Sequence, residues 1–318
     1  MISGEYGLLL RLADDGATVR KQLAQVQEQA ATGRVSDTYA GLGVQARTSL
    51  DLRPTIAHQA VWQSNIDSAA ARLDVTQSSL KAISQIASDF YAKTNSINDL
   101  GVSQVTDIAG AAKAALQQVA QLLNSKSGDI YVFAGQDTAN PPVPNTNPAA
   151  LSAALLATPT TTAPFSSTLG TAVPQVEVAE GQRMQVGVLA NANTLAVSSP
   201  PTSGSYMRDV MTSLATLANL TPGPTAQATA QTVRTQLSGA ITAMSSETGA
   251  MGNIQNTLTQ RKTALSETST ALSAQLSSVE DVDVAAALTQ ASSLQTQLQA
   301  SYQIIAASRQ LTLASFLR

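Results

Sequence analysis

The chain has 318 residues, of which 3% are aromatic and 12% are charged, and its formal net charge is −3. This balance excludes a nucleic-acid-binding protein, because no basic field is present to displace counterions from phosphates. The absence of cysteine excludes disulfides, thiol nucleophiles and thiolate metal sites, and no apolar run is long enough to span a membrane.

The first part of the chain carries one apolar seam. Small and apolar residues recur every three or four positions, at Leu9, Leu12, Gly16, Val19, Leu23, Val26 and Ala30. This heptad spacing predicts a helix that packs along one face. Gly33 is typical of the residue that follows a helix end, so we expect the helix to stop there.

Longer helices are expected next. Pro54 suits the first turn of a helix, and the apolar periodicity from there to about residue 98 predicts one long helix. A second helix is expected from Ser103. After the breaks at Pro222 and Pro224, a very long helix is predicted from about residue 225 to 276.

The middle of the chain has a different pattern. Residues 130–135, which include Phe133, are β-rich and bounded by glycine, and residues 175–188 alternate on both sides of Glu180 and Gly181, which predicts a hairpin. Residues 141–174 are rich in Pro, Thr, Ala and Asn, so we expect an exposed excursion with a short helix near residues 149–157.

The last stretch, residues 281–318, predicts a closing helix. Its stripe runs through Val284, Leu288, Ala291, Leu294, Leu298, Tyr302 and Ile305. Leu311, Leu313, Phe316 and Leu317 continue the apolar surface to the end of the chain. Such a surface requires a partner, and the seam near the N-terminus supplies one within the chain.

The predicted fold is therefore mainly α, with elongated, nested coiled-coil helices whose N- and C-terminal segments pair, and with a small β-rich insertion in the middle of the chain. We expect three parts. Residues 1–45 with 278–318 would form a terminal helical domain, residues 46–135 with 205–277 a rod of long helices, and residues 136–204 a β-rich insertion that faces outward.

Candidate catalytic and metal-binding residues are few. His58 is the sole histidine of the sequence, and neither a zinc motif nor a nucleophile elbow accompanies it. Glu280, Asp281 and Asp283 form the one tight acidic group. We interpret them as acidic residues at a helix N-terminus, where Ser277 and Glu280 match a capping box, rather than as a metal site.

The aromatic residues also favour packing over binding. Trp62, Phe90 and Tyr91 lie on the stripe of the first long helix, and Phe133 is expected in the core of the β arm. We therefore expect no catalytic residue, no cofactor and no metal.

Several segments resemble the flagellin superfamily, and within it the hook-associated proteins of the hook–filament junction. Residues 282–288 and 294–302 resemble the closing helix of the family, and residues 32–37 resemble the loop after its first helix. Met251, Gly252 and Asn253 are similar to its small-residue turn before the long return helix. Residues 131–135 and 180–183 resemble strands of the junction protein. Residues 38–43 and Arg318 depart from the usual pattern.

The resemblance implies a structural subunit of the bacterial flagellum. The terminal helices would form the inner tube and would order on assembly. The partners would be copies of the chain itself, neighbouring axial proteins (a hook-associated protein and flagellin), and an export chaperone on the C-terminal helix. Neither nucleic acid nor membrane insertion is expected. The protein would be secreted unfolded by the flagellar type III apparatus and would reside in the extracellular flagellum. The assembly interface would comprise Leu9, Leu12, Val19, Leu23, Val26, Leu288, Leu294, Leu298, Tyr302, Ile305, Leu311, Leu313 and Phe316.

Three alternatives remain open. The departures at residues 38–43 and at Arg318 leave room for a flagellin that builds the filament itself. A hydrolase carried on a flagellin-like scaffold would depend on His58. A free-standing coiled-coil secretion protein would need no ring or helical assembly.

Overall fold

The computed structural model describes residues 2–97, 102–157, 163–170, 172–195 and 203–316. It confirms a mainly helical chain with small antiparallel strand pairs in the middle. The helices are α1 (Ile2–Thr32), α2 (Tyr39–Leu42), η1 (Gly43–Gln45), α3 (Ala46–Asn95), α4 (Val102–Leu123), α5 (Pro148–Leu155), α6 (Tyr206–Ala218), α7 (Ala226–Glu280) and α8 (Val284–Phe316). The strands are β1 (Lys126–Ser127), β2 (Ile130–Tyr131), β3 (Gln175–Ala179) and β4 (Gln182–Gln185).

The chain folds as two compact units. The first unit consists of residues 1–58 and 267–318, and the second of residues 59–266. The first unit therefore combines the two ends of the chain. The three-part division into terminal domain, rod and insertion remains a prediction.

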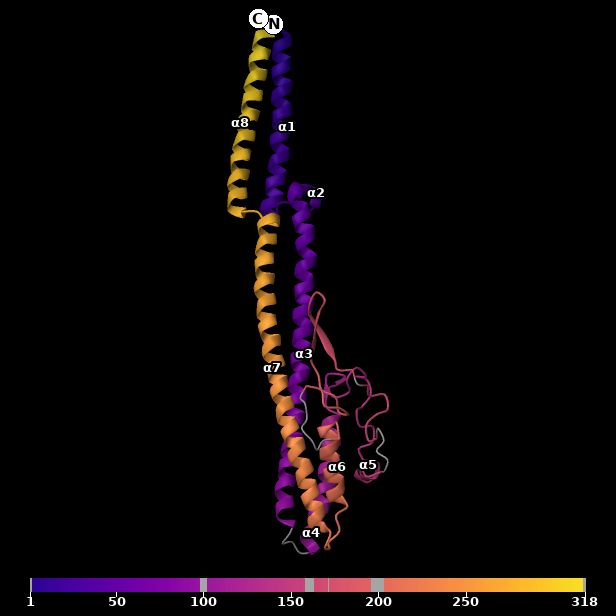
Figure 1. Ribbon diagram of the computed structural model, residues 1–318. Helices are drawn as coiled ribbons and strands as arrows, with labels where there is room; N and C mark the ends of the chain where they lie inside the picture. The colour runs from indigo at the N-terminus through magenta and orange to yellow at the C-terminus, as the bar shows by residue number, and fades with distance from the viewer. Residues whose placement is uncertain (1, 98–101, 158–162, 171, 196–202, 317–318) are drawn as a thin grey trace. The chain divides into compact units, whose positions relative to one another are not determined.

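In the first unit, α1 and α8 run side by side in opposite directions (Figure 1). α1 ends at Thr32, and Gly33 adopts a positive φ of 71° while its N–H donates to the carbonyl of Gln29 at 2.8 Å. Glycine adopts this left-handed conformation without the steric cost of a side chain. The predicted end of the first helix at Gly33 is confirmed.

The start of α3 corrects one prediction. Pro54 lies inside the helix rather than in its first turn, because α3 begins at Ala46. Proline has no N–H and therefore cannot bond to the carbonyl four residues earlier, a loss that tertiary contacts elsewhere in α3 have to offset. Ser49 is one residue of this early segment that is fully buried.

The core of the second unit is built from α3, α4, α6 and α7 (Figure 1). Polar contacts fix α7 beside α3: the Lys262 Nζ and Asp67 Oδ1 atoms are 2.6 Å apart, and Gln255 donates to Asp74 at 2.6 Å. The fully buried large side chains include Ile66, Leu73, Leu80, Ile83, Leu116, Leu123, Phe133, Tyr206, Met207 and Met211. The placement of Phe133 in the core is confirmed.

The predicted hairpin is also confirmed. β3 pairs with β4 in antiparallel register, and Gly181 at the turn has a φ of 68°. The β arm near Phe133 is shorter than expected, since β1 and β2 contain two residues each. Met251, Gly252 and Asn253 lie within α7, so the turn expected there is absent from this chain.

The Pro-rich segment corrects another prediction. The segment is not simply exposed, because Val143, Leu151 and Phe165 are buried in the core of the second unit. Asn124 holds it through two hydrogen bonds: its side chain donates to the Val143 carbonyl at 2.8 Å and accepts from the Val143 N–H at 2.9 Å. α5 then packs against α4 and α6.

Truncation of a core leucine should destabilise the second unit. Leu214 of α6 is fully buried, so Leu214→Ala should lower the free energy of unfolding by about 2–5 kcal/mol in a urea titration. Leu156 is 42% exposed and serves as the matched control, because Leu156→Ala should cost less than about 1 kcal/mol. Equal losses for both variants would contradict the assigned core.

Candidate assembly surface

The pair of terminal helices has a thin apolar core. Val26 of α1 packs with Ala287 and Ala291 of α8, and these three residues are between 4% and 9% exposed. Leu23, Ala30, Val282 and Leu294 are partly buried against them. Small alanine side chains let two helices approach closely, so the seam is narrow and buries little area.

The structure divides the predicted interface residues into three groups. Val26 is buried and Val19, Leu23, Leu294, Leu298 and Ile305 are half-buried, whereas Leu288 and Tyr302 are 58% and 46% exposed. The side chains of Leu9, Leu12, Leu311, Leu313 and Phe316 lie outside the described part of the structure. The expectation that these residues form an assembly interface remains a prediction.

Sequence reasoning missed Ala287, which faces α1 in place of the predicted Leu288. The predicted stripe reached Ala291 from Leu288, although Ala287, Ala291 and Leu294 have the same spacing of four and three residues. The spacing of Ala287 was therefore visible in the sequence. Because alanine occurs on every face of this helix, its position does not show which face is buried.

As a consequence, α8 presents large apolar side chains beside its seam rather than in it. Val284, Leu288 and Tyr302 are 40%, 58% and 46% exposed, and their spacing of 4 and 14 residues places them along one flank of the helix. Ile304 is 57% exposed. We call Val284, Leu288 and Tyr302 the exposed flank of α8. Residues 284–307 contain no charged side chain, so this helix offers a partner apolar and neutral polar contacts.

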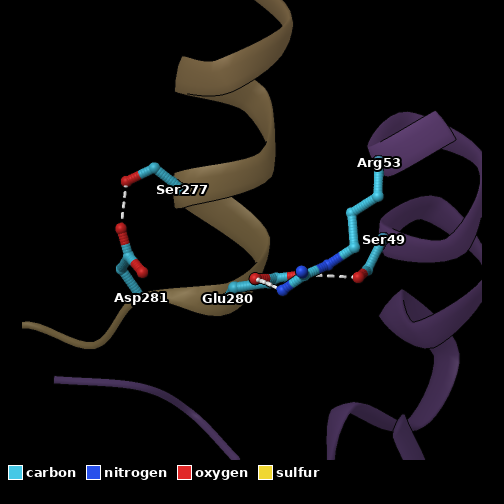
Figure 2. Close-up of polar contacts among 5 residues, drawn as sticks. All are labelled: Ser49, Arg53, Ser277, Glu280 and Asp281. Carbon is cyan, nitrogen blue, oxygen red and sulfur yellow. Dashed lines mark hydrogen bonds and ion pairs between the residues drawn. The ribbon is translucent and has the colours of Figure 1, made fainter. Parts of the chain in front are cut away.

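A carboxylate joins the end of α7 to α3 within the same unit. The Glu280 side chain accepts hydrogen bonds from Arg53 Nε at 2.8 Å, Arg53 Nη2 at 2.5 Å and Ser49 Oγ at 2.5 Å (Figure 2). Arg53 binds both carboxylate oxygens in the fork geometry that is specific to arginine. Glu280 is 7% exposed and Ser49 is fully buried, whereas the Arg53 side chain is 44% exposed, so the carboxylate is shielded on the Ser49 side and water reaches the arginine.

Backbone hydrogen bonds tie the same point to the end of α1. The Val35 N–H donates to the Glu280 carbonyl at 2.8 Å, and the Val282 N–H donates to the Gly33 carbonyl at 3.0 Å. Arg34 and Asp281 form an antiparallel bridge. The exit of α1, the end of α7 and the start of α3 therefore meet at Glu280.

The acidic group does not form the predicted capping box. α7 continues through Glu280, so Ser277 lies in the last turn of a helix and donates to the Asp281 carboxylate (Figure 2). Asp283 caps α8 instead, since its Oδ1 accepts from the N–H groups of Ala285 and Ala286 at 2.9 and 3.1 Å. The prediction of acidic residues at a helix start is correct for Asp283 and wrong for Glu280.

The electrostatics of the joint depend on Arg53. Its hydrogen bonds, followed by that of Ser49, lower the pKa of Glu280, while desolvation acts in the opposite direction. Glu280 in turn raises the pKa of Arg53. A negative side chain at a helix C-terminus is disfavoured by the helix dipole, so the arginine is what makes the ionised glutamate favourable at this position.

This pKa shift predicts how the joint responds to acid. A carboxylate whose pKa is lower in the folded chain stabilises the fold above its unfolded pKa of about 4.3 and loses that effect as the pH falls through the folded value. Wild type should therefore be more stable to urea than Glu280→Gln at pH 7 and pH 5, and the difference should vanish near the acid end of the titration. A difference that is constant or that grows on acidification would refute this role.

The other candidate residues are not among the groups that bind the Glu280 carboxylate. His58 is exposed, and Trp62 is half-buried. Phe90 is buried in the core of the second unit, with Tyr91 packed partly against it. Among the residues that the structure describes, no three His, Asp or Glu side chains gather in a way that would hold a metal ion.

The fold and this surface define a class of protein: a helical chain whose two ends form one unit, with apolar side chains left exposed on the last helix. Residues 235–317 match the model of the bacterial flagellin C-terminal helical region, which covers all of α8 as described and much of α7. The predicted resemblance of the closing helix to the flagellin family is thereby confirmed over these residues.

Solved structures share the fold. A proposed flagellar hook-associated protein from Vibrio parahaemolyticus is 16% identical, with a TM-score of 0.58 over 77% of this chain and 99% of its own. FlgL from Bacillus cereus is 18% identical, with a TM-score of 0.54 over 71% of this chain and 99% of its own. No curated protein sequence matches the chain.

Proposed function

We propose that the chain is a structural subunit of the bacterial flagellum that is assembled at the hook–filament junction through its terminal helices. The observation that carries this proposal is the flagellin C-terminal helical region, which coincides with a helix that leaves Leu288 and Tyr302 exposed. Exposed apolar side chains beside a thin internal seam are typical of surfaces that become buried on association.

The fold supports the junction over other positions in the flagellum. One of the two solved structures described above is named a flagellar hook-associated protein and the other FlgL, and this chain covers 99% of each. The alternative is a flagellin that builds the filament. It is favoured by the family match over residues 235–317, because the matched family is named for flagellin.

The partners follow from the proposed position. They would be further copies of this chain and the neighbouring axial proteins, with an export chaperone covering α8 until assembly. We propose secretion through the flagellar export apparatus in an unfolded state. Within the described residues, every helix is too short or too polar to cross a lipid bilayer. We propose a structural role and no catalytic one.

Locating the protein on isolated flagella tests the proposal. Immunogold labelling should mark one narrow band at the distal end of the hook. Labelling along the whole filament would support the flagellin alternative, and absence of label from purified flagella would overturn the flagellar role.

A further inference from the structure

Glu280 is bound from two directions by segments that are far apart in the sequence. Its side chain accepts hydrogen bonds from Ser49 and Arg53, which belong to α3, and its carbonyl accepts from Val35, which follows α1. We infer that Glu280 acts as a clamp from which order spreads into the paired helices α1 and α8. This inference goes beyond the proposed function and does not depend on it.

The position of the apolar core supports the clamp. Among the side chains that the structure describes in α1 and α8, the hydrophobic cluster is centred on Val26, Ala287 and Ala291. These residues lie in the turns next to Glu280, whereas farther along α8 the side chains of Leu298 and Ile305 are half-buried and that of Ile304 is 57% exposed. Among the described side chains, the apolar cluster of the pair therefore lies within a few turns of Glu280.

The physical reason is the cost of starting a helix pair. A helix nucleus fixes several backbone dihedral angles before it gains much hydrogen bonding, and each ordered residue costs about 1–2 kcal/mol of conformational entropy. The clamp fixes the exit of α1 and, through Val282 and Gly33, the entry of α8. Each helix then extends from an anchored end. Near that end, the small apolar area of the alanine seam is enough to hold α1 and α8 together.

The charged groups around the carboxylate come from each element packed against it. Arg53 from α3 and Arg34 from the segment after α1 both favour the ionised form of Glu280, and Tyr39 of α2 acts on Arg53. Asp281 is engaged by Ser277. Replacement of Glu280 by glutamine keeps the size of the side chain but removes the charge that both arginines face.

Hydrogen exchange on the isolated full-length chain tests the clamp. We expect wild-type amides at residues 26–32 and 285–294 to be more protected than those at residues 298–307. In Glu280→Gln, exchange at residues 26–32 and 285–294 should rise roughly tenfold or more, as expected for loss of a charge-assisted hydrogen bond, while exchange in α4 stays unchanged. Wild-type protection that is uniform along α8, or no rise in the variant, would overturn the inference.

Two further variants separate a specific clamp from general damage. Glu267 lies on the same helix and is exposed, so Glu267→Gln should leave exchange unchanged, and an equal rise there would count against the clamp. Arg53→Gln removes the opposite partner and should reproduce the pattern of Glu280→Gln. A rise caused by Glu280→Gln alone, without one in Arg53→Gln, would also overturn it.

Discussion

A chain that ends at Ser301 should remain a soluble monomer and should fail to enter flagella. The truncation removes Tyr302 and Ile304, which are 46% and 57% exposed, together with the rest of α8. About half of each side chain is already buried, so burying the rest against a neighbour stabilises an assembly by about 1.5–3 kcal/mol for the two together. Their loss should therefore reduce incorporation at least about tenfold, since each 1.4 kcal/mol corresponds to about a factor of ten.

The measurement is the amount of protein in sheared, purified flagella relative to the amount in the culture medium. The core of the second unit contains no residue beyond Ser301, so the truncated chain should keep the urea unfolding transition of this unit. That transition is the control for folding of the truncated chain. Normal incorporation of the truncated chain would refute the assignment of α8 as an assembly surface.

Charging the exposed flank of α8 should have a comparable effect without shortening the chain. In Leu288→Asp with Tyr302→Asp, both changed side chains are largely exposed, so the isolated chain should keep its stability. In an assembled wall the two carboxylates would be buried without a cation, because residues 284–307 of a neighbouring α8 carry no charge. A buried, unpaired charge costs several kcal/mol, and incorporation should fall at least a hundredfold.

A matched pair on the same helix gives the control. Thr289 and Gln303 are exposed polar residues that lie next to the substituted positions in sequence but away from the exposed flank of α8. Thr289→Asp with Gln303→Asp adds the same charge and should incorporate far better. Equal incorporation by the two double variants would show that the exposed flank of α8 has no special role in assembly.

Features with a local cause were predictable from the sequence. The end of α1 follows from the conformational freedom of Gly33, and the β3–β4 turn follows from Gly181 between two alternating segments. The long helices follow from regular apolar spacing. Each of these patterns lies within a short window of residues, so it predicts the local structure without knowledge of distant contacts.

Features that depend on distant contacts were not predictable. Pro54 is tolerated inside α3, although the local rule places proline in a first turn. The Pro-rich segment is drawn into the core by Asn124 and by isolated apolar residues such as Val143 and Phe165, which have no periodicity. The hydrogen bonds from Ser49 and Arg53 to Glu280 join residues separated by more than half the chain, and no short-range sequence pattern predicts them.

The candidate surface divides in the same way. The sequence identified Val26 and Leu294 as part of the terminal seam, because their spacing is regular. It could not tell whether Ala287 or Leu288 faces α1, since a rotation of about 100° about the helix axis separates neighbouring residues. The pairing of a narrow seam within the chain and an exposed flank beside it therefore required the structure.

The first unit combines residues 1–58 with residues 267–318, and this determines the order in which the two units are able to fold during synthesis. At about 5–20 residues per second, a ribosome needs on the order of tens of seconds to travel from Val26 to Ala287. The second unit, residues 59–266, is complete before Ala287 emerges. Val26 therefore has no partner until Ala287 has been made, and the same order applies whenever the chain is delivered from its N-terminus: the second unit is able to fold before the paired helices are.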